Sequence, residues 1–394
     1  MEVCLSAHDA YCALGRGIDS CVEQLLAGGV AVGQRQFEQL NEPLMLPYFA
    51  IPPAAAHAPD NQPDVYRSLY EIAANVLAKA GLDDKARQRT AILLGSSSYD
   101  VHVSEQLYQT DLPQRGDAAV PMAVIGYGRL VENLGNELGL SAYRFSYSTA
   151  CTSSANALLY GQRLISAGLV DHAMVIGLEW RNLTSILGFA GLGLISPSER
   201  MRPFQHDRDG LLLGEAIGCV LLSHPQQAPA NTPRLAGGAI ATDNHSLTAA
   251  NVDGVELARV IRQALQDSGI DSTQIKGIKA HATASLKNDE AEASAIRQVL
   301  GDSPPVLFAL KPFCGHTLGA SGALELALML GCLARGVLPG DPGVQSDESL
   351  GIKLLNQHIT ADSGYYLLNC FAFGGNNNVL VVHYPGSETS ACAS

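Results

Sequence analysis

The 394-residue sequence has little charge and lacks the signals of several special classes of protein. Charged residues make up 16% and hydrophobic residues 47%, which is typical of a compact globular chain and excludes extensive disorder. No segment stays apolar for the roughly 20 residues that a membrane helix needs. The first residues lack a basic region followed by an apolar run, so no secretion signal is expected. We expect a soluble, cytoplasmic protein long enough for two core-bearing halves.

The nine cysteines lack the spacing of a metal site or of a disulfide framework. We therefore expect no metal, and reduced structural or terminal cysteines at Cys4, Cys12, Cys21, Cys332 and Cys392. The net charge of −13 argues against general nucleic-acid binding, which depends on lysine and arginine contacts to phosphates. An acidic partner would have to dock on a local basic patch, because the overall field repels it.

Apolar, β-rich runs alternate with helical periodicity along the chain, which predicts an α/β fold with buried strands. The segment 224–233 is polar and proline-rich and is the best linker candidate, so we divide the chain into 1–228 and 229–394. Buried strands are expected at 90–95 and 173–177, and helices at 64–80, 121–138, 152–167 and 318–334.

The same plan recurs on both sides of the linker. In the first half, a strand-like run at 143–147 leads to Cys151 and a helix. In the second half, a strand-like run at 306–310 leads to Lys311, His316 and a helix. Each half would therefore present polar groups at the N-terminus of one helix.

Cys151 stands among small residues directly before a helix-like stretch. Free backbone N–H groups and the positive end of the helix dipole favour an anion there, so the position predicts a thiol of lowered pKa. A cysteine is more often a small buried hydrophobe. Here His281, Lys311 and His316 follow in motifs rich in small residues, and a cysteine with distant histidines is the pattern expected of a catalytic thiol.

Two further motifs accompany these residues. Strands are expected at 365–369 and 379–383, joined through Gly374 and Gly375, whose backbone freedom would let the chain approach a bound group. An ordinary hairpin is the alternative interpretation. After His281, Asn288 is placed to cap a helix.

Taken together, these segments resemble the β-ketoacyl-acyl-carrier-protein synthases, the ketosynthases of the thiolase superfamily. The motifs are Thr-Ala-Cys at 149–151, Arg-Pro-Phe at 202–204, Arg-Asp-Gly at 208–210, His-Ala-Thr at 281–283, Gly-His-Thr at 315–317 after Lys311, and Phe-Gly-Gly-x-Asn at 373–377. Each motif is weak alone, but the ordered set is specific and spans nearly the whole chain. The resemblance implies a thiolase-like fold, with two similar βαβαβαββ halves in a five-layered α-β-α-β-α arrangement.

The resemblance implies a decarboxylative Claisen condensation that elongates a fatty-acid or polyketide chain. Cys151 would accept an acyl chain from a carrier-protein thioester, and the carbanion formed by decarboxylating malonyl-carrier protein would then attack it. His281 and His316 would donate hydrogen bonds to the malonyl thioester carbonyl. No cofactor is implied. The expected partners are acyl carrier protein and a second subunit, in a homodimer or a heterodimer, with no nucleic acid and no membrane.

The family pattern also implies supporting roles. Lys311 would organise the histidines through its charge, and Glu325 through a buried polar network. The backbone N–H groups of Cys151 and Phe373 would meet the developing oxyanion, and Phe373, followed by Gly374 and Gly375, would gate the second substrate. Arg115 and Arg208 match positions that dock the carrier protein.

The chain departs from the family pattern at several positions. Ala282 and Ala284 stand where glycines are usual, which matters if the backbone there needs a positive φ. Pro312, Ala372, Asn376 and the cysteines Cys314 and Cys370 are also unusual. These changes suggest a divergent pocket, as in specialised-metabolite ketosynthases of the aryl polyene type.

Two alternatives remain open. A chain-length-factor subunit would be a ketosynthase-like scaffold, but such subunits commonly lack the nucleophile, which is retained here. A degradative thiolase would need a second cysteine as acid and base, and Cys370 is nearby but precedes Phe371 where ketosynthases have serine. The sequence does not specify the acyl chain.

Overall fold

The computed structural model describes residues 1–30, 32–37, 43–52, 64–119 and 126–386. Two successive halves of the chain each follow the order βαβαβαββ. The first half is built from β1 (Val3–Cys12), α2 (Val65–Ala80), β5 (Thr90–Gly95), α5 (Gly126–Glu137), β6 (Arg144–Tyr147), α6 (Ser153–Ser166), β7 (His172–Glu179) and β8 (Ala216–Ser223). The second is built from β9 (Arg234–Thr242), α8 (Val255–Asp267), β10 (Ile275–Lys279), α9 (Leu286–Leu300), β11 (Val306–Phe308), α11 (Ser321–Ala334), β14 (Gly364–Phe371) and β15 (Asn376–Tyr384).

Smaller elements decorate this repeat. They are β2 (Gly15–Arg16), α1 (Ile18–Leu26), β3 (Gly33–Phe37), β4 (Leu44–Tyr48), α3 (Asp84–Gln88), α4 (Val101–Arg115), α7 (Leu183–Gly191), α10 (Lys311–Cys314), β12 (Val337–Leu338) and β13 (Ile359–Thr360). Among the described residues, no helix is long and apolar enough to cross a membrane.

The strand order is the same in the two halves. It is β6-β5-β7-β8-β1 in the first and β11-β10-β14-β15-β9 in the second. In each half the first three strands are parallel and the last two pairings are antiparallel. A short pairing of Val3 and Cys4 with β9 joins the two into one continuous path. The shared topology confirms the predicted thiolase-like fold.

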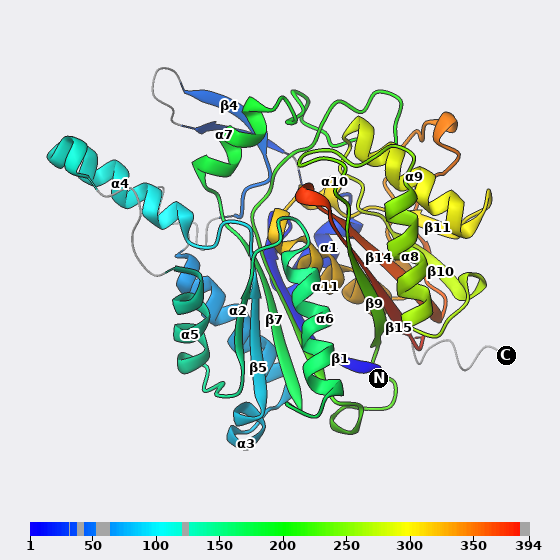
Figure 1. Cartoon of the computed structure of the whole chain (residues 1–394), viewed down its shortest axis with the longest axis horizontal. Coiled ribbons are helices and arrows are strands. Elements are labelled where there is room, and N and C mark those ends of the chain that lie inside the picture. The colour runs from blue at the N-terminus through cyan, green and yellow to red at the C-terminus, as the bar shows by residue number, and fades with distance from the viewer. Residues whose placement is uncertain (31, 38–42, 53–63, 120–125, 387–394) are drawn as a thin grey trace.

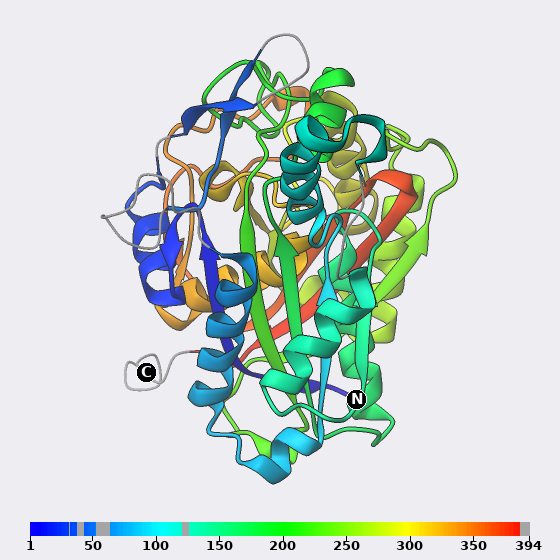
Figure 2. The same cartoon turned by 90° about the vertical axis from the view of Figure 1, so that its left-hand side faces the viewer.

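Alternating side chains divide the protein into layers, because successive residues of a strand point to opposite faces. On β7, Ala173 and Val175 face a central core, whereas Met174 and Ile176 face an outer one. The central core also holds α6 and α11, which contact strands of both halves. Helices α2 and α5 cover one outer face, and α8 and α9 cover the other (Figures 1 and 2). The five-layered arrangement is confirmed.

Most predicted elements lie where the pattern placed them. Helix α2 begins after Asp64, whose carboxylate accepts hydrogen bonds from the N–H groups of Tyr66 and Arg67, and ends before Gly81 with φ of 64°. The predicted helix at 121–138 is described from Gly126 as α5, and its expected first turn lies outside the described residues. The segment 224–233 connects β8 to β9, so the division into 1–228 and 229–394 falls within a connection and stays a prediction.

One predicted helix start is wrong. Helix α9 begins at Leu286, and Ser285 takes the N-cap position, so Asn288 lies within the first turn. The Asn288 side-chain oxygen instead accepts a hydrogen bond from the Ala250 N–H, at 3.3 Å. A residue that shapes a neighbouring loop and one that caps a helix have the same sequence signature, since both need a short polar side chain.

Candidate active site

The repeated topology brings the predicted site residues together. Cys151 follows β6 in the first half, and Lys311 and His316 follow the corresponding strand, β11, in the second. His281 follows β10, and Phe373 follows β14. The central helices α6 and α11 pack against each other, so the two loops that precede them meet at one end of the central layer. This juxtaposition makes a single site from groups far apart in sequence, such as Cys151 and His316, which are separated by 165 residues.

Cys151 lies at the start of α6, as predicted, and is 5% exposed. Ala150, directly before it, has φ of 51°, so the chain turns sharply at the sulfur. The expectation of a lowered thiol pKa is wrong. Burial raises the pKa of Cys151 to about 12, and this effect exceeds the lowering by the Lys311 charge and by the N–H of Phe373. A buried thiol of this kind needs a neighbouring base before it can attack.

His316 is placed to act as that base, because its Nε2 lies 3.1 Å from the Cys151 Sγ. Its Nδ1 lies 3.3 Å from the hydroxyl of Ser321. When Nδ1–H donates to this hydroxyl, Nε2 is free to accept the thiol proton. Burial, followed by the charges of Lys311 and Lys279, lowers the pKa of His316 well below its ordinary value, so the ring is neutral at neutral pH.

His281 stands beside His316, with ring centroids 5.5 Å apart and planes at 87°. Lys311 Nζ lies 3.3 Å from its Nδ1. Because an ammonium only donates, Nδ1 is the acceptor and the proton of the neutral ring sits on Nε2. Burial, followed by Lys311, also lowers the pKa of His281 well below its ordinary value. The two imidazoles are therefore neutral groups able to donate hydrogen bonds.

Glu325 holds the lysine that orients His281. Lys311 is fully buried, and its Nζ lies 2.6 Å from Glu325 Oε1. This geometry agrees with the polar network expected of Lys311 and Glu325.

Sequence reasoning missed Lys279, which is also fully buried and contacts Glu325 Oε2. The available signal was a lysine on a strand between Ile278 and Ala280, two residues before His281, where a solvated side chain has no room.

Two buried acids on α9 hold the loop after β10. Glu292 accepts hydrogen bonds from the N–H groups of His281, at 2.8 Å, and Ala282, at 2.9 Å. Asp289 accepts from the N–H of Ala284, at 3.2 Å, and burial raises its pKa to about 7. The loop needs this support, because Ala282 and Ala284 have φ of 54° and 62°. Both alanines therefore occupy the left-handed region, where glycine is favoured.

The loop after β14 closes the site. Gly374 and Gly375 have φ of 74° and 72°, and the Phe373 ring stacks on Phe189 of α7, with centroids 5.7 Å apart. The adjoining strands β14 and β15 pair as a hairpin, which confirms the hairpin interpretation, whereas the approach of Gly374 and Gly375 to a bound group stays a prediction.

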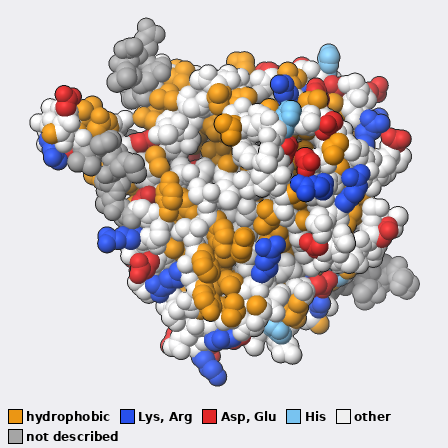
Figure 3. Space-filling model, in the orientation of Figure 1, with side chains coloured by type: hydrophobic (Ala, Val, Ile, Leu, Met, Phe, Trp, Pro, Cys, Tyr) orange, Lys and Arg blue, Asp and Glu red, His pale blue; other side chains and the backbone are white. Residues whose placement is uncertain are grey.

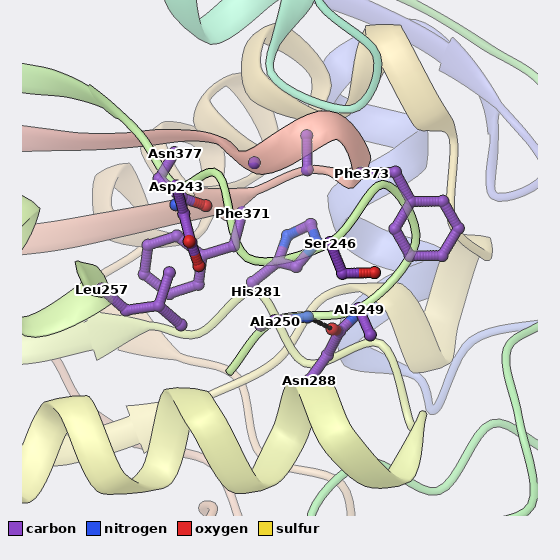
Figure 4. Close-up of a pocket in the computed structure, with 12 residues that line it drawn as sticks. Asp243, Ser246, Ala249, Ala250, Leu257, His281, Asn288, Phe371, Phe373 and Asn377 are labelled. Carbon is purple, nitrogen blue, oxygen red and sulfur yellow. Dashed lines mark hydrogen bonds between the residues drawn. The ribbon is translucent and has the colours of Figure 1, made fainter. Parts of the chain in front are cut away.

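Figure 4 shows His281 in a pocket between Phe371 and Leu257 on one side and Ser246 and Phe373 on the other. Its free volume of about 20 Å³ holds about one water, which is too little for a thioester in this conformation.

The two expected docking arginines differ in accessibility. Arg115 lies at the end of α4, which projects from the body (Figure 1), and its side chain is 53% exposed and pairs with Asp111. The Arg208 side chain is only 3% exposed, and its guanidinium lies 3.2 Å from carboxylates of both Glu290 and Asp347. A docking side chain must reach its partner, which the Arg115 side chain can do in this structure and the Arg208 side chain cannot, and the docking roles of both arginines stay predictions.

Among the cysteines that the structure describes, Cys151 contacts a histidine, whereas Cys314 contacts backbone oxygens. The eight described cysteines are free and buried, and Cys392 lies outside the described residues. Cys314 and Cys370 both pack in the central core. Within the ranges that the structure describes, no cluster of histidine, cysteine and acidic side chains could hold a metal.

Comparison with known proteins identifies two consecutive family domains. Residues 20–228 match "Beta-ketoacyl synthase, N-terminal domain", and residues 233–345 match "Beta-ketoacyl synthase, C-terminal domain". The 3-oxoacyl-[acyl-carrier-protein] synthase 2 of Vibrio cholerae is 27% identical over 340 residues, covering 79% of this chain and 81% of that protein. The protein of the same name from Mycobacterium tuberculosis is 30% identical over 288 residues, covering 68% of each.

Solved structures agree over almost the whole chain. The ketosynthase ApeO in complex with its chain length factor ApeC, from Xenorhabdus doucetiae, has a TM-score of 0.84 at 28% identity and covers 97% of this chain and 98% of that one. The ishigamide ketosynthase/chain length factor has a TM-score of 0.83 at 26% identity, with 98% and 99% coverage.

Proposed function

The chain belongs to the β-ketoacyl synthase family, and from that premise we propose that it elongates an acyl chain by decarboxylative Claisen condensation with malonyl-acyl carrier protein. The observation that carries the proposal is the contact of 3.1 Å between Cys151 Sγ and His316 Nε2, with His281 beside it. A nucleophile, a base and two neutral hydrogen-bond donors in one buried site are what acyl transfer followed by decarboxylation requires.

In the first half-reaction, the Cys151 sulfur attacks the thioester carbonyl of an acyl-carrier protein while His316 Nε2 takes the thiol proton. The N–H groups of Cys151 and Phe373 stabilise the oxyanion. The carrier-protein thiolate leaves and receives the proton from His316. Because burial raises the pKa of Cys151, the proton moves only as the sulfur attacks, and the site does not store a reactive thiolate.

In the second half-reaction, His316 takes its other neutral tautomer, with Nδ1 accepting from the Ser321 hydroxyl and the proton on Nε2. The malonyl thioester carbonyl then accepts hydrogen bonds from Nε2–H of His281 and Nε2–H of His316. Loss of CO₂ leaves an enolate that these two donors stabilise. Its carbon attacks the Cys151 thioester carbonyl, the bond from that carbonyl to the cysteine sulfur breaks, and the released thiolate takes a proton from solvent water. Neutral imidazoles suit this step because they donate hydrogen bonds without protonating the enolate carbon.

A second subunit belongs to the proposal. Strand β6 is an edge of the sheet, and Tyr143, Phe145 and Tyr160 near it are 41%, 38% and 42% exposed. Figure 3 shows apolar side chains gathered over the region where α6 lies in Figure 1. An unpaired strand at the edge of a sheet, next to exposed aromatic side chains, favours association with another chain. The similar ketosynthase ApeO is described in complex with a chain length factor. We therefore propose that this chain forms either a homodimer or a heterodimer of that kind, with the interface at the β6 edge.

We also propose that the protein is located in the cytoplasm. Buried free thiols at every described cysteine are typical of proteins from reducing compartments, where disulfides do not persist.

The test is to incubate the protein with a panel of acyl-carrier proteins, measure its intact mass, and then add malonyl-carrier protein. The proposal expects acylation of the wild type and of Cys314→Ala, a matched buried cysteine, but none of Cys151→Ala. Wild-type protein that stays unmodified, yet activates a co-expressed synthase, would instead establish the chain-length-factor alternative.

A further inference from the structure

Lys279 is a second buried cation in the active-site network. It ends β10, two residues before His281, and is fully buried. Its Nζ contacts Glu325 Oε2 and lies 2.8 Å from the carbonyl oxygen of Asn369. The other oxygen of Glu325 binds Lys311. One carboxylate is therefore shared by two buried ammonium groups, whereas the condensation described above uses only one of them.

The contacts of Lys279 close a ring around His281. Asn369 donates its side-chain N–H to Glu292 Oε1, at 2.9 Å, and the same oxygen accepts the backbone N–H of His281. On the other side, Glu325 and Lys311 lead to Nδ1 of the His281 ring. Lys279 thus fixes both the backbone and the ring of His281, through two independent paths. Networks of this kind are stronger than isolated pairs because each bond polarises its neighbours.

The network places two lysines closer to the imidazole rings than its acids, since Glu325 pairs with both lysines and Glu292 binds the backbone of His281. Two lysines face one directly paired carboxylate, and Lys279 is among the charges that lower the pKa of both His281 and His316, after burial and Lys311. Cys151 and Lys311 contact these rings directly, and Lys279 acts on them through its charge. The other titratable groups of the surrounding elements act through these neighbours or through the backbone: Glu325 pairs with both lysines, Glu292 and Asp289 accept backbone N–H groups of the loop after β10, and Cys370 lies on β14 near the two lysines. Removing Lys279 would leave a balanced Lys311–Glu325 pair and a smaller positive potential at both rings.

We propose that Lys279 is a positioning residue for the condensation, which shares Glu325 with Lys311 and so keeps His281 and His316 neutral, with the His281 N–H directed at the malonyl thioester. The inference rests on the proposed function but assigns a residue that the reaction steps do not touch. A purely structural Lys279 would contribute to folding and leave the protonation of the histidines unchanged.

The first test compares the two half-reactions in Lys279→Met and Lys279→Gln, with Lys276→Met as an exposed control on the same strand. In Lys279→Met, we expect decarboxylation of malonyl-carrier protein to fall by about tenfold or more and acylation of Cys151 by less than about threefold. Decarboxylation should fall further at pH 6 than at pH 8, since the histidines protonate more readily without Lys279. Lys279→Gln keeps a hydrogen-bond donor but no charge, and should show the same pH dependence.

Equal losses in both half-reactions, unchanged between pH 6 and pH 8, would overturn the proposal. If Lys279→Met does not fold, Lys279→Gln decides by the same pH comparison. Alkylation of Cys151 by iodoacetamide needs no carrier protein, so it separates this proposal from the proposed function. The acid limb of its pH profile, which reports His316, should move to higher pH in Lys279→Gln, and an unmoved limb would overturn the role.

Discussion

The loop after β6 and the loop after β11 hold the same place in the two halves, yet they supply different chemistry. The first presents one sulfur among small, uncharged residues at the start of α6. The second presents Lys311 and His316, which join a buried network through Glu325. Duplication of one topology thus places a nucleophile opposite the groups that activate it. The comparison teaches that position comes from the shared fold, whereas the division of labour comes from the side chains.

The largest effect is expected from removing the Cys151 thiol, which is the reactive group of the loop after β6. Cys151→Ala should abolish condensation, with a loss of at least about 10³-fold, because no other described thiol lies beside His316. Decarboxylation of malonyl-carrier protein should persist, since it depends on the second loop and His281. Radiolabelled CO₂ release measures the latter, and loss of both activities together would contradict the division of labour.

Removing the shared carboxylate tests the second loop. Glu325→Gln leaves Lys279 and Lys311 buried without a charge partner, which should lower the free energy of unfolding by about 3–5 kcal/mol. Chemical denaturation measures this loss. A loss below about 1 kcal/mol, the size expected of an exposed pair, would show that the network is solvated.

The two histidines should separate the half-reactions. His316→Ala should slow both acylation and decarboxylation, because His316 contacts Cys151 and also faces His281. His281→Ala should slow decarboxylation by about 10²-fold and leave acylation nearly unchanged. Single-turnover assays of each step test this. Equal losses in both steps for His281→Ala would remove the distinction between the rings.

The smallest effect concerns the strained loop after β10. Ala284→Gly should stabilise the fold by up to about 1 kcal/mol, because glycine adopts φ of 62° without strain. Ala280→Gly is the matched control, a buried alanine without positive φ, and should destabilise. Thermal unfolding compares the two. If Ala284→Gly lowers the stability as Ala280→Gly does, the backbone at Ala284 is not strained by the alanine side chain.

The sequence was sufficient for the fold and for which residues meet. Strand and helix periodicity, with the repeat on either side of 224–233, predicted an α/β fold with two similar halves, and the resemblance to ketosynthases implied its five layers. Ordered motifs predicted the meeting of Cys151, His281, Lys311 and His316. These features depend on local pattern and on topology, which a sequence records directly.

The pKa shifts and ion pairs of the site could not be predicted from the sequence. The helix N-terminus suggested a lowered pKa for Cys151, but tertiary burial outweighs it. The sequence predicted an exposed Arg208, but in the folded chain its side chain is buried and pairs with Glu290 and Asp347. Lys279 was hidden because its partners lie 46 and 90 residues away in sequence. Burial and long-range pairing are properties of the packed chain, so a motif cannot specify them.

The most direct test of the central claim, that the second half activates the nucleophile of the first, is the rate of Cys151 alkylation by iodoacetamide at pH 7 in wild type and in His316→Ala. The account predicts a fall of at least about tenfold in the variant, with a rate that then rises in proportion to hydroxide concentration, as for an unassisted buried thiol. An unchanged rate at pH 7 would contradict it.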